Sequence, residues 1–142
     1  MPYPEEMCAP MRAELTSQGF TELRTAEEVE NKLPNASGTS LLVINSVCGC
    51  AAGSARPAAI HAINNGKKPD NLFTVFAGQD LEATNEARKH TLPYPPSSPC
   101  IALFKDGKLV HFIERHHIEG SNAEMISENL RMAFDDHVSV AS

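Results

Sequence analysis

The chain has 142 residues, of which 42% are hydrophobic and 21% are charged, and its formal net charge is −6. This length and composition suit a single globular domain with its own buried core. The acidic balance argues against a nucleic-acid partner, and no segment approaches the length of a membrane span. Because the first residues are acidic where a secretory signal would be basic, we expect a cytoplasmic protein.

Two helices are expected before the first strand. Apolar residues recur at every fourth position over residues 5–18, which is typical of an amphipathic helix. Thr25 and Glu28 have the spacing of a capping box, which predicts a second, short helix that Pro34 ends. We therefore expect residues 1–34 to form a helical N-terminal extension.

The middle of the chain alternates between strand and helix patterns. Residues 41–44 form a continuous apolar run, the pattern of a strand buried on both faces. Residues 51–65 are rich in alanine and predict a helix that packs closely, with Pro57 kinking it or delaying its start. A second strand is expected over 72–76 and a weakly amphipathic helix over 80–90.

The last part of the chain predicts a hairpin followed by a helix. The segment TLPYPPSSP holds four prolines in nine residues and excludes regular structure. An Asp-Gly step between the predicted strands 101–104 and 109–113 is a strong hairpin signal. Ser121 and Glu124 have capping-box spacing and predict the start of a final amphipathic helix.

The predicted order is two N-terminal helices followed by β-α-β-α-β-β-α. A βαβ unit followed by a helix and an antiparallel hairpin gives a mixed sheet with helices on both faces. This is the order of the thioredoxin fold. We therefore expect an α/β fold with a thioredoxin-like mixed sheet, flanked by helices and preceded by two extra N-terminal helices. Residues 1–142 are expected to form one domain, with the extension over 1–34 and the thioredoxin-like core over 39–135.

Two of the four cysteines, Cys48 and Cys50, follow the first predicted strand and flank Gly49. Such a pair could be a structural disulfide, a set of metal ligands, a redox centre or an inert buried pair. Cytoplasmic thiols are kept reduced, so a close pair there indicates catalysis or metal binding rather than a structural disulfide. The sequence has no second Cys-x₂-Cys to complete a zinc or Fe–S site, which favours the redox centre.

The position of the pair predicts different roles for its two thiols. Cysteines two positions apart on a helix point away from each other, so this pair can meet only where strand turns into helix, and Gly49 would permit the turn. A disulfide there closes a ring of about eleven atoms and departs from relaxed geometry, which makes it easier to reduce. The helix N-terminus favours a thiolate. We expect Cys48 to be the nucleophile and Cys50 to be the resolving thiol.

The stretch SSPCIALFKDGK is similar to the thioredoxin segment in which a cis-proline opens a strand, which implies a cis Ser98–Pro99 bond at the substrate-binding edge. Four further segments carry a closer resemblance: PMRAELTSQGFTELRTAEEVE, NSVCGCAAGSARPAA, TVFAGQD and HFIERHHIEG. Together they resemble the bacilliredoxin family, small thioredoxin-like proteins with a Cys-Gly-Cys centre. The resemblance runs from about Pro10 to Phe134 and implies thiol–disulfide exchange at Cys48 and Cys50.

The other two cysteines lie outside the pair. Cys8 accompanies the apolar side chains of the first predicted helix and is expected to be a core residue. Cys100 directly follows the proline of the SSP segment, at the predicted edge of the site, where the family commonly has serine. We therefore treat Cys100 as a candidate third thiol that contacts substrate.

Three basic side chains are candidates for binding an acidic small thiol. Arg115 and His116 follow the last predicted strand, on a loop expected near the active face, and Arg56 lies in the predicted kinked helix. A solvated turn is the ordinary interpretation of the first two, and a surface or capping role is the ordinary one for Arg56. Stabilisation of a thiolate or pairing with a carboxylate is the functional alternative.

The sequence thus predicts a cytoplasmic thiol–disulfide oxidoreductase whose Cys-Gly-Cys centre removes bacillithiol, or a similar small thiol, from protein mixed disulfides. No bound cofactor and no metal are expected, and an external thiol or reductase would supply electrons. The expected partners are protein mixed disulfides and a low-molecular-weight thiol, not nucleic acid or membrane. A protein disulfide isomerase is the nearer alternative, and a thiolate carrier of zinc or an Fe–S cluster is the alternative of another class.

Overall fold

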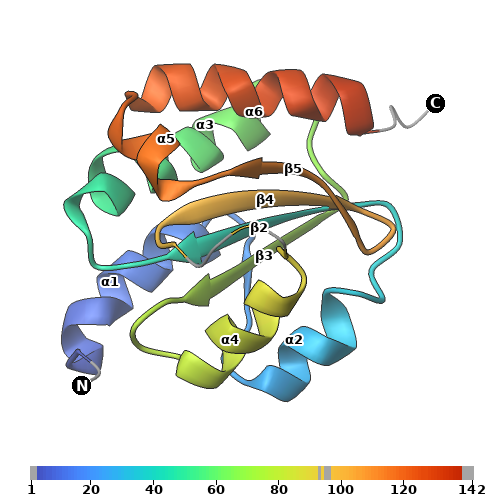
Figure 1. Ribbon diagram of the computed structural model, residues 1–142. Coiled ribbons are helices and arrows are strands. Elements are labelled where there is room, and N and C mark those ends of the chain that lie inside the picture. Colours follow the sequence, from blue (N-terminus) through green and yellow to red (C-terminus); the bar gives the residue numbers. More distant parts are fainter. Residues whose placement is uncertain (1–2, 93, 95–96, 139–142) are drawn as a thin grey trace.

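A mixed five-stranded sheet with helices on both faces forms the centre of the molecule (Figure 1). The structure is a computed structural model, and it describes residues 3–92, 94 and 97–138. The strand order is β1-β3-β2-β4-β5. Strand β3 lies between β1 and β2 and is parallel to both, whereas β4 runs antiparallel to β2 and to β5. The strands are β1 (Thr21–Glu22), β2 (Thr39–Asn45), β3 (Asn71–Phe76), β4 (Cys100–Lys105) and β5 (Lys108–Ile113).

The helices fill the connections in the predicted order. The two N-terminal helices, the helices after β2 and β3, and the long C-terminal helix are all confirmed. A short π-helical segment, η1 (Ala51–Ala55), precedes α3. The α-helices are α1 (Glu5–Thr16), α2 (Ala26–Lys32), α3 (Arg56–Asn65), α4 (Leu81–Lys89), α5 (Arg115–Glu119) and α6 (Ala123–His137).

The core has two layers that meet at the sheet. Strand β2 is buried along its whole length, as the apolar run predicts. Because successive side chains of a strand point to opposite faces, Leu41 and Val43 pack against α3 and α6, while Leu42 and Ile44 pack against α2 and α4. In Figure 1 the first pair of helices lies above the sheet and the second pair below it. This sandwich fixes the carboxyl end of β2, where the Cys-Gly-Cys segment begins.

The structure differs from the sequence prediction at three local features. Strand β1 joins the sheet beside β3, so the N-terminal segment contributes a strand as well as its two helices. The final helix is capped by Asn122, whose side-chain oxygen accepts the N–H of Met125, and the predicted Ser121 cap is wrong. The segment from Arg115 forms helix α5 rather than a turn.

Pro57 accounts for the late start of α3. The residue lies in the first turn of α3, where its missing N–H costs no helical hydrogen bond. The five residues before α3 wind as η1. This confirms that the proline delays the regular helix. The segment that follows Cys50 is therefore a π-helical turn, a feature that recurs at functional sites.

The hairpin between β4 and β5 forms at the predicted Asp-Gly step. Asp106 and Gly107 have φ of 50° and 81°, the left-handed values of a tight hairpin turn. A Cβ at Gly107 would lie 2.5 Å from the carbonyl oxygen of Pro34, so glycine is also required by the close approach of the α2 end.

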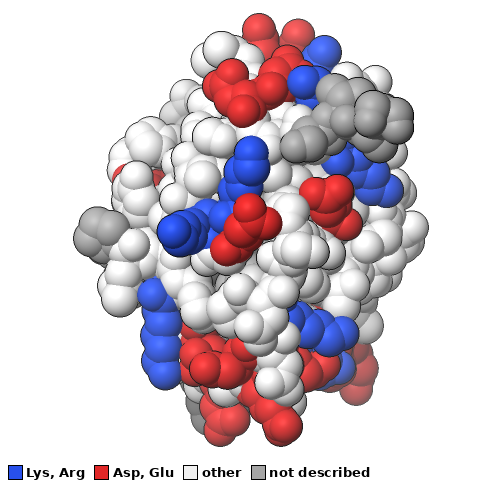
Figure 2. Space-filling model, turned by 90° about the vertical axis from the view of Figure 1, so that its right-hand side faces the viewer, with Lys and Arg blue, Asp and Glu red and all other residues white. Residues whose placement is uncertain are grey.

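Figure 2 shows the face at this hairpin end of the molecule, opposite the ends of β2 and β3 towards which their arrows point in Figure 1. Lys and Arg side chains lie on it in small separate groups, each close to acidic side chains. Among the described residues, no helix has the length and apolar character needed to cross a lipid bilayer.

Candidate functional site

A shallow hollow of about 230 Å³ lies where β2 and β3 end and β4 begins. Open α/β sheets bind ligands at this carboxyl edge of their parallel strands. The hollow is lined by Tyr3, Ser46, Val47, Cys48, Ala77, Gly78, Ser98 and Arg115.

Cys48 and Cys50 face each other at this edge. Their sulfur atoms lie 2.8 Å apart, and both are free thiols in the described structure. The carbonyl of Cys48 accepts the N–H groups of Ala51 and Ala52, so Cys48 begins the helical turn. Since a disulfide is about 2.05 Å long, a small movement of the two sulfur atoms would close the bond.

The turn that brings the pair together does not depend on the freedom of glycine. Gly49 has no left-handed φ, and a Cβ added to it would meet no described atom within 4 Å. The expected conformational role of Gly49 is therefore wrong. The side chain of Ser46 holds the turn instead, because its hydroxyl oxygen accepts the N–H of Cys48 at 3.2 Å.

The two thiols have pKa values shifted in opposite directions. The pKa of Cys48 is lowered, first by the hydrogen bond from the Cys50 thiol, then by backbone N–H groups and the charge of Arg115. The pKa of Cys50 is raised, first by burial and then by its contact with Cys48. Cys48 is thus the better thiolate and Cys50 the retained proton donor, which supports the roles expected for them.

Arg115 is the cation of the site. Its Nη2 donates to the sulfur of Cys48 at 3.4 Å, and its Nη1 donates to the carbonyl oxygen of Ser98 at 3.1 Å. Its Nε forms an ion pair with Glu119, one helical turn along α5. Arg115 therefore connects the sulfur of Cys48, the loop before β4 and a nearby carboxylate.

The loop before β4 has the expected backbone. The Ser98–Pro99 peptide bond is cis, which confirms the assignment made from the thioredoxin-like segment. Prolines 93, 95 and 96 of the same loop lie outside the described residues. The carbonyl of Ser98 reaches the site through Arg115, so the structure brings this predicted residue together with Cys48.

Cys100 lies close in sequence to this loop, but its side chain is directed elsewhere. It is 2% exposed and packs among the apolar residues on the α2–α4 face, whereas Cys50 contacts the cluster on the α3–α6 face. Burial raises the pKa of Cys100 to about 12. The structure does not bring this thiol into the hollow, so the expectation of a third thiol at the site finds no support. Cys8 is fully buried, as expected for a core residue.

Arg56 occupies a different place from the one expected. A surface or capping side chain, or a receptor for an acidic ligand, would be exposed, but Arg56 is 1% exposed. Its guanidinium forms an ion pair with Glu14 and donates to Asn45 and to the carbonyl of Ser46. The expectation was wrong because a single sequence does not show that a carboxylate on α1 faces the start of α3.

His117, one of the two histidines of α5, caps its own helix. Glu114 and His117 form a reciprocal capping box, in which the Nδ1 of His117 accepts the N–H of Glu114. His116 is exposed, and its ring nitrogen lies 3.9 Å from a carboxylate oxygen of Glu114. Within the described residues, these three side chains are the group close enough to share a metal ion, and no cysteine belongs to it. The capping contacts already account for the arrangement.

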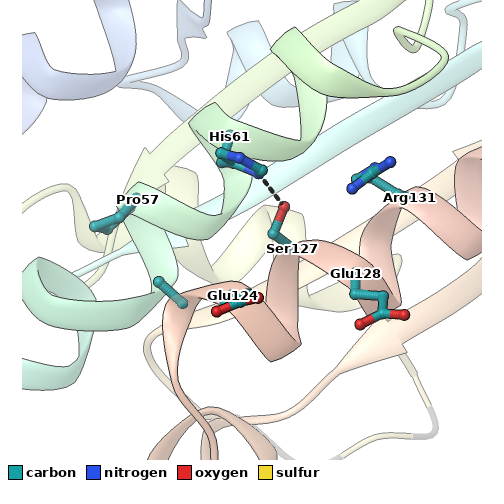
Figure 3. A pocket seen from close by; sticks show the side chains of 7 residues that line it. Pro57, His61, Glu124, Ser127, Glu128 and Arg131 are labelled. Carbon is teal, nitrogen blue, oxygen red and sulfur yellow. Dashed lines mark hydrogen bonds between the residues drawn. The ribbon is translucent and has the colours of Figure 1, made fainter.

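A larger hollow of about 450 Å³ lies between α3 and α6 (Figure 3). Its floor holds a 2.8 Å hydrogen bond between the ring of His61 and the hydroxyl of Ser127. Glu128 and Arg131 point from α6 along its side. The hollow shares no lining residue with that of Cys48 and contains no cysteine. The smaller hollow, which Cys48 lines, is therefore the candidate site for thiol chemistry.

Comparison with known proteins places this geometry in context. Residues 3–138 match the model of the family described as Disulphide isomerase. A bacilliredoxin from Cytophaga hutchinsonii is 60% identical over 134 residues, which cover 94% of this chain and 98% of that protein. A bacilliredoxin from Halalkalibacterium halodurans is 55% identical over 135 residues, which cover 95% of this chain and 94% of that protein.

Solved structures confirm the thioredoxin-like fold. Mitochondrial thioredoxin 3 from Saccharomyces cerevisiae superposes with a TM-score of 0.57 at 20% identity, covering 87% of this chain and 98% of that chain. A thioredoxin variant from Halobacterium salinarum gives a TM-score of 0.59 at 12% identity, covering 88% and 96% of the two chains. At these identities the likeness concerns the fold alone.

Proposed function

Because the chain belongs to the bacilliredoxin family and is a thiol–disulfide oxidoreductase, we propose that Cys48 and Cys50 are its redox-active pair and that it removes bacillithiol, or a similar small thiol, from protein mixed disulfides. One observation above all supports this assignment. The sulfur of Cys48 lies 3.4 Å from the guanidinium of Arg115 and 2.8 Å from the sulfur of Cys50, with a lowered pKa beside a raised one.

The proposed reaction has two exchange steps. The Cys48 thiolate attacks the sulfur of the small thiol in the mixed disulfide, forms a new S–S bond to it, and releases the protein thiolate, which takes up a proton. Cys50 loses its proton and attacks the sulfur of Cys48, which expels the small thiol and leaves a Cys48–Cys50 disulfide. An external thiol or reductase then returns two electrons and two protons to the pair.

Arg115 supports the choice of an acidic small thiol. Bacillithiol bears carboxylates, and a guanidinium binds a carboxylate through parallel N–H donors. Arg115 already pairs with a carboxylate, that of Glu119, beside the sulfur of Cys48. A substrate carboxylate would replace Glu119 on Arg115, while the Ser98–Pro99 edge positions the disulfide. We keep His116, the exposed neighbour of Arg115 in the chain, as a second candidate for contacting the substrate. Arg56 is buried and does not serve as one.

Two alternatives remain open for the pair. The description of the matching family as Disulphide isomerase favours rearrangement of protein disulfides as the second candidate function. It would use the same attack by Cys48, followed by a second exchange within the substrate. A thiolate carrier of zinc or an Fe–S cluster belongs to another class, and the thiol–disulfide oxidoreductases to which this chain is similar argue against it.

We place the reaction in the cytoplasm, with mixed disulfides of proteins and a low-molecular-weight thiol as partners. Thiols are kept reduced there, so a disulfide formed between Cys48 and Cys50 would be returned to the dithiol state after each turnover.

The deciding experiment uses the Cys50→Ser variant, which can attack but cannot resolve. It is offered one model protein that carries bacillithiol and another that carries glutathione, and intact mass is measured over time. We expect a bacillithiol adduct on Cys48 that forms much faster than the glutathione adduct. Equal rates of formation of the bacillithiol and glutathione adducts would contradict the proposed specificity for bacillithiol. No adduct, together with activity of the wild type on scrambled disulfides, would make the isomerase the correct assignment.

A further inference from the structure

Arg56 is a buried arginine directly behind the Cys48 turn. It is the first residue of α3 and is 1% exposed. Its Nη1 donates to the side-chain oxygen of Asn45 at 2.7 Å and to the carbonyl oxygen of Ser46 at 3.0 Å. Its Nε forms an ion pair with Glu14 of α1. One guanidinium thus joins α1, the start of α3 and the end of β2.

The hydrogen bonds continue from Arg56 to the backbone of Cys48. The side-chain oxygen that Arg56 holds on Asn45 also accepts the N–H of Ser46 at 2.9 Å. The hydroxyl of Ser46 in turn accepts the N–H of Cys48 at 3.2 Å. The amide nitrogen of Asn45 donates to the carbonyl of Met11, which ties this end of β2 to α1. Directional hydrogen bonds thus connect Arg56 to the backbone of Cys48 through Asn45 and Ser46.

A buried arginine is a poor choice for stability alone. Removing a guanidinium from water is costly, and replacing a buried ion pair with apolar side chains of similar volume often leaves a protein as stable or more so. What the arginine supplies is geometry, since its rigid fork holds several acceptors at fixed directions. Here those acceptors are the two residues that set the path of the chain into the Cys48 turn.

We infer that Arg56 is a positioning residue for Cys48: held by Glu14, it fixes Asn45 and Ser46 and so keeps the sulfur of Cys48 beside Arg115 and the helical N–H groups. The inference rests on the proposed function in assuming that Cys48 is the nucleophile. Arg56 does not touch the reacting sulfur atoms. Its effect is on where the thiolate lies, and thus on how strongly its surroundings stabilise it.

The test is the Arg56→Lys variant, which keeps the positive charge and shortens the reach. The nitrogen of lysine ends where arginine has its Cζ, one bond short of the Nη1 that holds Asn45 and Ser46. Iodoacetamide labelling of reduced protein is followed as a function of pH, with peptide mapping to read Cys48 alone. We expect the labelling midpoint to move to higher pH, and labelling at pH 7 to slow by about three- to tenfold.

A matched control comes from the other buried arginine of the chain's N-terminal half. Arg12 is 6% exposed and pairs with Glu5 of α1, Glu22 and Asp80, but makes no contact with Asn45, Ser46 or Cys48 among the described hydrogen bonds. Arg12→Lys should lower the thermal unfolding midpoint as Arg56→Lys does, yet keep the labelling profile of the wild type.

Glu14→Gln is the milder companion variant, because Glu14 is half exposed and its replacement leaves Arg56 in place. It should fold and shift the profile in the same direction by less. Wild-type labelling profiles in folded Arg56→Lys and Glu14→Gln would overturn the inference, and so would equal shifts in Arg12→Lys. If Cys50 rather than Cys48 labels first in the wild type, the proposed function fails, and this outcome is distinct from an unaltered profile in the variants.

Discussion

The Cys-Gly-Cys turn and the start of β4 place thiols close together in the fold and give them opposite chemistry. Ile44, the penultimate residue of β2, pairs with Cys100, the first residue of β4, and Cys48 follows three residues after β2 ends. Cys48 is partly exposed with a lowered pKa. Cys100 is 2% exposed with its pKa raised to about 12 by burial.

The difference shows what makes a thiol reactive in this fold. Beyond β2 the chain has left the sheet, and the sulfur of Cys48 meets helical N–H groups and the guanidinium of Arg115. Cys100 is the first residue of its strand, and its alternation places the side chain in the apolar layer beneath α2 and α4. The pKa of each thiol thus depends on whether the cysteine lies beyond the end of a strand, as Cys48 does, or within a strand, as Cys100 does.

The largest expected effect is that of Cys48→Ser. A serine hydroxyl is not ionised near neutral pH, so the variant has no nucleophile at the N-terminus of the helical turn. We expect thiol–disulfide exchange to fall on the order of a thousandfold or more, with a wild-type circular dichroism spectrum. A coupled assay on a mixed-disulfide substrate measures this. Residual activity within about tenfold of the wild type would place the nucleophile elsewhere.

The next largest effect is expected from Cys50→Ser, which separates the two exchange steps. The first attack by Cys48 proceeds, but the small thiol stays on its sulfur because the neighbouring thiol at 2.8 Å is gone. We expect a near-stoichiometric adduct in intact mass spectra and little multiple turnover. Loss of the adduct without added thiol, with release of the small thiol in a single turnover, would mean that another thiol of the protein resolves it, and Cys100 would then be the residue to replace as well.

The sequence alone was sufficient for the elements with a clear local signal. The apolar run of β2, the capping at Thr25 and the Asp-Gly hairpin are such signals, and each element forms where its signal lies. The closeness of Cys48 and Cys50 was equally predictable, because the sequence contains both their spacing and their place after a buried strand. The order of these elements then determined the fold, since few topologies accept a βαβ unit followed by a hairpin.

What the sequence did not show depends on contacts between distant segments. A two-residue strand such as β1 has no period, and its place in the sheet is set by pairing with β3. The burial of Arg56 depends on Glu14, 42 positions away. Cys100 looked like a site residue because it follows Pro99, and only the register of β4 against β2 reveals which face its side chain takes.

A smaller effect is expected when Arg115 is replaced by leucine. The positive charge beside the sulfur contributes to the lowered pKa of Cys48, so its loss should raise that pKa while the N–H groups and Cys50 still act. A thiolate loses reactivity as pH falls through its pKa, and in the variant this loss begins at higher pH. We expect labelling of Cys48 at pH 7 to slow by about three- to tenfold, read by peptide mapping across a pH series.

The matched control is Arg115→Lys, because lysine restores the positive charge without the planar guanidinium and its parallel N–H donors. Arg115→Lys should recover most of the labelling rate but less of the preference for a carboxylate-bearing thiol, since bidentate pairing is lost. An unaltered pH profile in Arg115→Leu would show that the helical N–H groups and Cys50 alone stabilise the thiolate.

The smallest effect on activity is expected at Cys100, which tests the other side of the comparison. With a pKa of about 12, its thiolate fraction at pH 7 is on the order of one part in 10⁵. Its side chain also lies on the opposite face of the sheet from the cluster that Cys50 contacts. Cys100→Ala should therefore exchange disulfides within about twofold of the wild type, and adduct lifetime in the Cys50→Ser background should be unchanged. A longer adduct lifetime in the double variant would return Cys100 to the reaction.

The same variant should change how stability depends on pH. Because burial raises the pKa of Cys100 above the ordinary thiol value of 9.0, the folded state keeps this proton longer than the unfolded state. Below pH 9 the protonated Cys100 thiol therefore makes its full contribution to the free energy of unfolding of the wild type. That contribution falls as pH rises towards 12, by no more than about 1.4 kcal/mol per pH unit. At pH 7 Cys100→Ala should be less stable by about 1 kcal/mol, from lost packing. At pH 10.5 we expect urea unfolding to show that gap closing or reversing. A gap that stays constant between the two pH values would mean that the Cys100 thiol is not buried as the structure has it.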